Sequence, residues 1–222
     1  MKSTILFRKL LCTLALLVCF ISFSNPVNVG NPYWEGEILL SDGTVKKGFV
    51  EVIKHEKQSK VNFKASLKAK EEEIDRKTIE AAHLISPSGK KYTYEKVSPT
   101  STITGTKGYG SILALVSGRN GYATTYITSE NYVVDSKTNE IILYYRYNPS
   151  TDFMLTKYFI KKRGSDVAKL VYMTGHLGGI KKGVNEHLSE AKELVKRVND
   201  GEFDSNDMQE ILQLYLKETE GM

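Results

Sequence analysis

Apolar and polar residues alternate between residues 33 and 53, a pattern typical of half-buried β-strands. Trp34, Ile38 and Leu40 share the apolar face of the first run. The Asp42-Gly43 pair that follows favours a tight turn, because glycine adopts positive φ without steric cost. We therefore predict a β-hairpin at the start of this region.

A second hairpin is predicted in the middle of the chain, over Ser111–Thr128. Ile112–Val116 is the densest apolar run outside the N-terminus, which fits a strand buried on both faces. Asn120-Gly121 predicts a tight reversal with positive φ. A β-rich run, Tyr122–Ile127, follows the reversal. We expect the apolar residues of the first strand all to be buried, namely Ile112, Leu113, Leu115 and Val116.

Other strand-like runs surround this hairpin up to about residue 161. They are Thr78–Ile85, Lys90–Val97, Tyr132–Val134, Ile141–Tyr147 and Phe153–Ile160. Helical spacing of apolar residues begins after them, at Ser165–Thr174 and at Glu186–Val198, where Gly201 follows as a stop signal. Asp204 is the predicted cap of a last helix, with Asp207 three residues on. The predicted buried face of that helix consists of Met208, Ile211, Leu212 and Tyr215.

Strands followed by helices predict an α+β fold. We expect a mainly antiparallel sheet, either a sandwich or a partly closed barrel, because no helices lie between the strands to connect them in parallel. The predicted antiparallel β domain covers residues 33–162. A helical segment of two to three helices, residues 163–222, is expected to pack on it.

Residues 1–24 have the pattern of a secretory signal peptide. Three basic residues precede an apolar run, Leu10–Phe23, which is shorter than the roughly 20 residues needed to span a bilayer. Small residues precede the predicted cleavage site between Ser24 and Asn25. An uncleaved N-terminal anchor is the alternative. Residues 25–32 are predicted to form a flexible leader, and no membrane span is expected after cleavage.

Removal of this segment changes how the composition is interpreted. Both cysteines, Cys12 and Cys19, lie within it, so the mature chain would have neither a disulfide nor a thiol nucleophile. The formal net charge of +5 for the whole chain falls to +2, because the segment holds three basic residues and no acidic ones. We therefore expect no nucleic-acid partner.

The sequence contains no motif that predicts a catalytic, cofactor or metal site. The histidines, His55, His83, His176 and His187, do not form a close ligand pair and are interpreted as surface or capping residues. No serine lies in the Gly-x-Ser-x-Gly motif of a nucleophile elbow. Carboxylates that only the fold could bring together remain as candidates for an acid/base site, such as Glu35, Glu37 and Glu140.

Two surface features allow alternative interpretations. The lysines between Lys54 and Lys70, followed by Glu71–Glu73, predict a solvated segment with charges of both signs, or else a basic surface for an anionic partner. Tyrosines are frequent in the predicted strands, and strand propensity alone accounts for them. The alternative is a stacking surface for sugar or peptide, formed by Tyr92, Tyr94, Tyr122, Tyr126, Tyr144, Tyr145 and Tyr147.

The order of several short motifs resembles that of uncharacterised exported proteins of Bacteroidota. The motifs are Gly36–Leu40, Asp42-Gly43, Lys47-Gly48, Ala114–Gly118, Ile142–Tyr145 and Ile211–Tyr215. The resemblance implies an exported protein with a β-rich domain and C-terminal helices, and it implies no activity.

These observations lead to one principal expectation and two alternatives. We expect a cell-envelope protein, periplasmic or extracellular, that is a non-enzymatic binding or interaction module for a protein or glycan partner. The first alternative is a carrier of a lipid or small hydrophobic molecule in a β-barrel cavity. The second is a hydrolase with an unrecognised acid/base site.

Overall fold

The fold is that of a computed structural model. The structure describes residues 32–53, 58–129, 132–135, 137–143, 147–148, 152–153, 156–174 and 179–222. The predicted signal peptide, its cleavage site between Ser24 and Asn25, and the leader up to residue 31 lie outside the described residues. The described helices and strands belong to one compact unit, Tyr33–Met222.

The described strands precede the described α-helices along the chain. The strands are β1 (Tyr33–Leu40), β2 (Val45–Glu51), β3 (Lys60–Lys64), β4 (Glu72–Asp75), β5 (Ile79–Ile85), β6 (Lys91–Pro99), β7 (Ile112–Arg119), β8 (Ala123–Ser129), β9 (Tyr132–Val134), β10 (Ile141–Leu143), β11 (Tyr147–Asn148), β12 (Asp152–Phe153), β13 (Thr156–Lys162) and β14 (Val167–Met173). The helices are α2 (Lys181–His187), α3 (Lys192–Asp200) and α4 (Met208–Glu218), and a short 3-10 helix, η1 (Arg76–Thr78), precedes β5.

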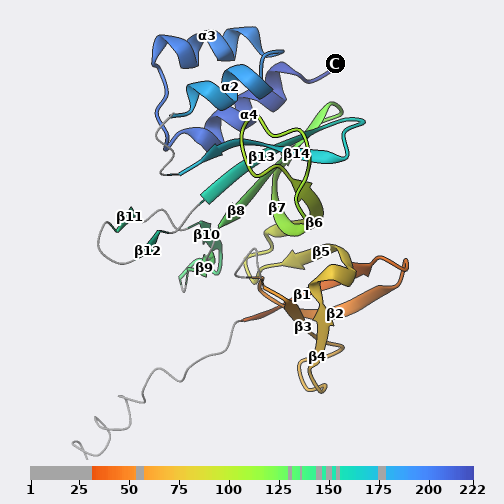
Figure 1. The fold of residues 1–222 in the computed structure, drawn as a ribbon. Helices are drawn as coiled ribbons and strands as arrows, with labels where there is room; N and C mark the ends of the chain where they lie inside the picture. The colour runs from red at the N-terminus through yellow and green to blue at the C-terminus, as the bar shows by residue number, and fades with distance from the viewer. Residues whose placement is uncertain are drawn as a thin grey trace, which may run out of the picture. The chain divides into compact units, whose positions relative to one another are not determined.

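Ten strands form one sheet, in the order β14-β13-β8-β7-β6-β5-β1-β2-β3-β4 (Figure 1). Neighbours in this order pair antiparallel. A short parallel pairing of β14 with β6 closes β6, β7, β8, β13 and β14 into a ring. The fold is therefore α+β and mainly antiparallel with partial closure, as predicted.

The buried residues form three clusters along this sheet. The first lies on one face of β1, β2 and β5 and includes Trp34, Ile38 and Leu84. The second fills the interior of the ring with large side chains, among them Tyr126 and Phe159. β6 and β7 contribute to both clusters. One continuous sheet therefore contributes side chains to both the first core and the ring interior.

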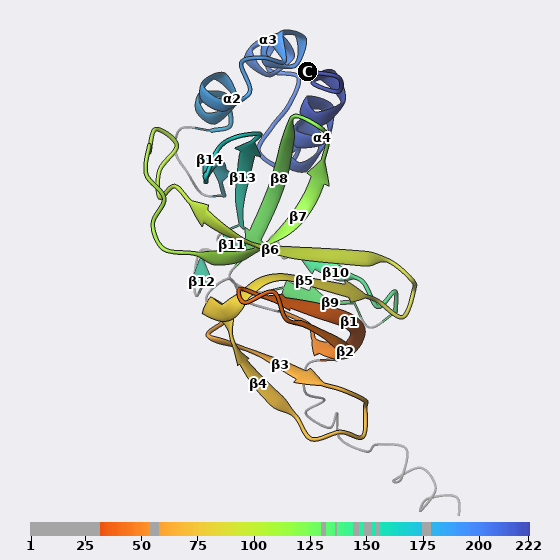
Figure 2. The same ribbon diagram turned by 90° about the vertical axis from the view of Figure 1, so that its right-hand side faces the viewer.

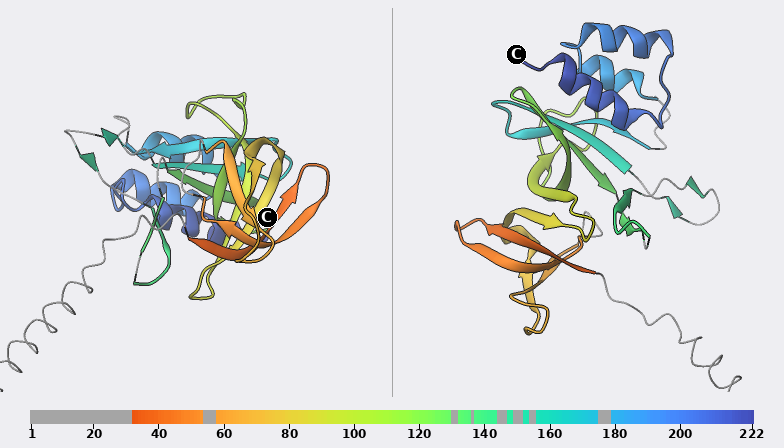
Figure 3. Two further views of the ribbon diagram at one scale, coloured as in Figure 1. Left: turned by 90° about the horizontal axis from the view of Figure 1, so that it is seen from below. Right: turned by 180° about the vertical axis from the view of Figure 1, so that it is seen from behind.

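The third cluster lies between the outer face of the ring and the helices. Figures 2 and 3 show α2, α3 and α4 together beside β8, β13 and β14, with β1–β5 at the other end of the sheet. The predicted face of the last helix is confirmed as buried, namely Met208, Ile211, Leu212 and Tyr215. α2 contacts β14 so closely that a Cβ atom on Gly183 would overlap the carbonyl oxygen of Val171.

The central hairpin is confirmed as β7 and β8, with two corrections. Leu113 and Leu115 are buried, but Ile112 and Val116 are only half-buried. Neither residue of Asn120-Gly121 has positive φ. The Asn120 side chain closes the turn instead, by accepting hydrogen bonds from the amides of Tyr122 and Ala123. Its amide group also donates to the carbonyl of Leu216 at the end of α4, so the turn is fastened to that helix.

Two helix predictions are wrong. Val167–Met173 is strand β14, because one face of it lies against the ring interior and the other against the helices. A strand buried on both faces does not show the alternation that reveals a half-buried strand. The run Glu186–Val198 is divided between α2 and α3 by a break at residues 188–191. Gly201 ends α3 in the left-handed conformation, as predicted.

Asp204 and Asp207 are only partly correct as a predicted cap. α4 begins after Asp207, and no side chain caps its first turn. The Asp207 carboxylate accepts a hydrogen bond from the Asp204 amide at 2.7 Å, which is one half of a capping box. The Asp204 carboxylate accepts from the Asn206 amide instead.

Candidate functional site

The candidate site is a groove of about 630 Å³ on the face of β2, β1, β5 and β6 that points away from the first core. Figure 2 shows these strands next to one another. Gly36 and Gly48 pair directly across β1 and β2 at the floor of the groove, which is therefore backbone rather than side chain. The floor continues over the backbone of Leu84 and Tyr92, whose side chains are buried in the core.

Two rows of side chains form the walls, because strand register places partners directly opposite one another. The first row runs across the strands as Phe49, Glu35, Ile85 and Lys91. The second row runs parallel to it as Lys47, Glu37, His83 and Thr93. Members of the two rows are two residues apart on each strand, a separation of about 7 Å.

The second row is internally paired. Glu37 and Lys47 form an ion pair at 3.6 Å, and Nδ1 of His83 lies 3.1 Å from the Thr93 hydroxyl oxygen. The first row is different, because neither Glu35 nor Lys91 forms an ion pair within the part of the chain that the structure describes. Glu35 and Lys91 are also exposed. One wall of the groove therefore presents charges that are free to bind a ligand.

The fold brings two of the candidate carboxylates together and separates the third. Glu35 and Glu37 lie on the same face of β1, with His83 directly opposite Glu37. Glu140 pairs with Lys90 at 3.0 Å and does not line the groove. Neither groove carboxylate is buried. Burial is the usual means of setting a general acid apart from a base, so this pair lacks the environment typical of a hydrolase.

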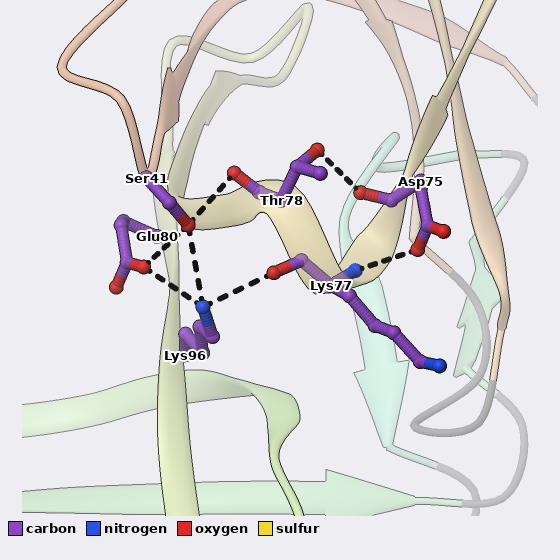
Figure 4. Close-up of polar contacts among 6 residues, drawn as sticks. All are labelled: Ser41, Asp75, Lys77, Thr78, Glu80 and Lys96. Carbon is purple, nitrogen blue, oxygen red and sulfur yellow. Dashed lines mark hydrogen bonds and ion pairs between the residues drawn. The ribbon is translucent and has the colours of Figure 1, made fainter.

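A second polar cluster joins Ser41, Glu80 and Lys96 (Figure 4). Ser41 Oγ and Lys96 Nζ both donate to one Glu80 oxygen, at 2.6 and 2.8 Å. Lys96 also donates to Ser41 Oγ and to the carbonyl of Lys77. Hydrogen bonds from Lys96 and then Ser41 hold the pKa of Glu80 below its usual range, which makes it a poor acceptor for a serine proton. We interpret the cluster as a structural one that holds the β1–β2 turn against β5 and β6.

A more polar groove of about 490 Å³ lies where the β7–β8 and β13–β14 turns meet. Three of its four basic residues already bind other groups of the fold, and Lys161 is the fourth. Arg119 pairs with Glu95 at 2.5 Å, Lys162 pairs with Glu190, and Arg163 donates to the carbonyl of Gly121. This groove is therefore a weaker candidate for an anion site.

The histidines do not assemble into a metal site in the described residues, which contain no group of three metal-ligating side chains. His55 and His176 lie outside the described residues. His83 is exposed in the groove. His187 is only 8% exposed, so its interpretation as a surface or capping residue is wrong. Its Nε2 lies 2.6 Å from the carbonyl oxygen of Ile103, in the loop before β7.

The alternative of a tyrosine stacking surface is contradicted for those of its tyrosines whose side chains the structure describes. Tyr92, Tyr94 and Tyr126 are buried, and the half-buried Tyr122 donates its hydroxyl to Glu190. Tyr144 and Tyr145, and the side chain of Tyr147, lie outside the described part.

The lysine-rich segment is confirmed as a region with charges of both signs in the part that the structure describes. Lys60 pairs with Glu73 across β3 and β4, and Lys64 pairs with Glu71 at 3.9 Å. Lys54 and Lys57 are outside the described part. These pairs use two of the charges on which the alternative, a basic surface for an anionic partner, depends.

The groove was not predicted as a unit from the sequence, although Glu35 and Glu37 were named. Its other members are ordinary strand residues, and only the register of four strands places them in two rows. Comparisons with protein-family models, curated proteins and solved structures gave no match. In the described residues, no helix has the length and apolar character needed to cross a membrane.

Proposed function

We propose that this protein is a binding module that holds an extended peptide segment of a partner protein in the groove over β2, β1, β5 and β6. The observation that carries the proposal is the pair of parallel rows on a backbone floor. The rows are about 7 Å apart at their Cβ atoms, so the side chains of both rows can contact one chain that lies over the floor. Four strands spaced about 4.8 Å apart give the groove a length of about 14 Å, or four extended residues.

The chemistry of the walls favours a peptide over a glycan. The walls combine both signs of charge with the apolar side chains of Phe49 and Ile85. Such walls suit a chain whose own side chains alternate in character. Sugar rings stack on exposed aromatic faces, and Phe49 is the single aromatic side chain in the walls. The carrier alternative has less support, because buried side chains such as Phe159 and Leu170 fill the ring interior.

A pair of tryptophan variants tests the proposal on an array of immobilised twelve-residue peptides of varied sequence. Thr93→Trp places a large ring in the groove, whereas Thr106→Trp places the same ring on an exposed loop outside it. We expect a subset of peptides to bind the unmodified protein and Thr106→Trp, and to bind Thr93→Trp at least about tenfold more weakly.

Two results would contradict the proposal. One is that no peptide on the array binds. The other is that peptides bind equally well to Thr93→Trp. A glycan array probed in parallel covers the remaining class of partner, and binding to glycans alone would also count against a peptide site. Release of cleaved fragments from the array would instead favour a hydrolase that uses Glu35 and Glu37.

We also propose that the protein is exported and acts in the cell envelope, outside the cytoplasm. The support is the basic and apolar pattern of residues 1–24 and the small residues before Asn25. Mass spectrometry of the protein recovered from the envelope fraction should find Asn25 as the first residue. Recovery of the chain from the cytoplasm with its N-terminus intact would refute export.

A further inference from the structure

We infer that the groove selects a basic side chain, lysine or arginine, and that Glu35 is the residue that binds it. This inference rests on the proposed peptide-binding function. It begins from the position of Glu35 in the first row, directly between Phe49 on β2 and Ile85 on β5. Cβ atoms at such directly paired positions are about 5 Å apart. The carboxylate is thus flanked on both sides by apolar side chains.

Charge pairing distinguishes Glu35 from its neighbour Glu37. Glu37 has Lys47 at 3.6 Å, so its charge is already partly compensated. Glu35 has no ion pair with any residue that the structure describes, and its side chain is exposed to the groove. The Coulomb attraction of Glu35 is therefore available to a ligand.

Lysine and arginine side chains match these surroundings in both of their parts. Their aliphatic stems pack against apolar surface while the charged end stays outside it. At Glu35 the stem would lie on Ile85 and Phe49, and the cation would reach the carboxylate. The Phe49 ring adds a favourable contact for a cation that lies over its face. A hydrogen bond between a cation and a carboxylate is stronger than one between neutral groups.

The far end of the same row gives the bound segment a direction. Lys91 lies two strands from Glu35, a distance of about 10 Å across the sheet. Lys91 is exposed and has no ion pair with a described residue. Three residues of extended chain cover the same distance. The groove therefore fits a segment with a basic residue at one end and an acidic residue towards the other.

The test compares two substitutions on the same face of β1, Glu35→Gln and Glu37→Gln. Each removes one negative charge from the groove and keeps the size of the side chain. The probe is a peptide array in which each position of the binding peptides is replaced in turn by every amino acid. For the unmodified protein we expect one position to require lysine or arginine. Glu35→Gln should weaken binding of those peptides about tenfold and remove the requirement, because a charge-assisted hydrogen bond is lost. Glu37→Gln should retain the requirement.

The outcomes separate this inference from the proposed function. Peptides that bind without any requirement for a basic residue would overturn the inference and leave the peptide groove in place. Equal effects of Glu35→Gln and Glu37→Gln would overturn it as well. They would show that the ligand responds to the net negative charge of the groove and not to a specific contact with Glu35. Absence of binding by every peptide would refute both. Matching thermal unfolding of the two variants shows that any difference arises in the groove and not in the fold.

Discussion

The protonation state of His187 depends on the residues that surround it in the fold. It lies at the end of α2, is buried, and bonds through Nε2 to the carbonyl of Ile103. A carbonyl accepts only, so Nε2 carries the proton. Burial lowers the pKa of His187, and the hydrogen bond to Ile103 opposes this shift without reversing it. The fold thus favours the neutral imidazole.

The stability of the protein should therefore depend on pH through His187. Since the pKa is lower in the folded state, the unfolded chain binds more protons below its own pKa of about 6.5. The contribution of His187 is complete above that pH and is lost as the pH falls towards the folded pKa. Urea unfolding at pH 7.5 and 5.5 should show a smaller pH-dependent loss for His187→Gln than for the unmodified protein.

The matched control for this measurement is His83→Gln, which changes an exposed histidine of β5. It should leave the pH dependence close to that of the unmodified protein. An unchanged loss of stability in His187→Gln would assign the effect to other groups. The sequence shows His187 beside an apolar stripe but does not show Ile103 opposite it, because the two residues are far apart in the chain.

Two glycines, Gly183 and Gly121, lie where one element contacts another. They differ in what an added Cβ atom would meet. Gly183 lets α2 approach β14, and a Cβ atom there would overlap the backbone of Val171. Gly121 lies in the β7–β8 turn without positive φ, and a Cβ atom there would meet the end of the Arg163 side chain at 3.2 Å. Backbone at a packed interface cannot move aside as a flexible side chain can.

Gly183→Ala should destabilise the protein by about 1–3 kcal/mol, because α2 must move away from β14 to make room for the Cβ atom. This loss would exceed the gain in helix propensity of up to about 1 kcal/mol. Gly121→Ala is the matched control and should stay within about 0.5 kcal/mol of the unmodified protein. Chemical denaturation of both variants measures the difference. Equal stability of the two would mean that α2 does not pack against β14 at Gly183.

At the scale of the whole molecule, the first core and the ring share β6 and β7. Tyr94 and Leu115 of these strands belong to the first core, and Val97 and Ala114 belong to the ring. The Asn120 side chain in turn joins the β7–β8 turn to the last helix. Disruption of either core therefore removes strand partners from the other.

The described unit should consequently unfold in one transition. Trp34, the single tryptophan of the chain, reports on the first core by fluorescence. Far-UV circular dichroism is weighted towards the helices beside the ring. The midpoints from the two signals should agree within about 2 °C. Two separate midpoints would show that the first core and the helical layer unfold independently.

The sequence by itself determined the local structure of those elements that bury one face and expose the other. Alternation predicted β1 and β2, the Asp42-Gly43 turn was correct, and the apolar stripe of α4 marked its buried face. These signals succeed because each of these elements has one buried face and one face exposed to solvent. Its apolar residues therefore recur at the period of the strand or helix. The order of strands before helices was enough to establish the α+β class.

Only the tertiary structure decided the rest. β14 lacks alternation because both of its faces are covered, and its pairing with β6 joins residues about 70 positions apart. The groove likewise depends on register, which places Glu35 between Phe49 and Ile85. A shift of one residue would turn these side chains to the opposite face. Local sequence encodes the faces of each strand, whereas packing of distant segments decides which strands meet and which side chains become neighbours.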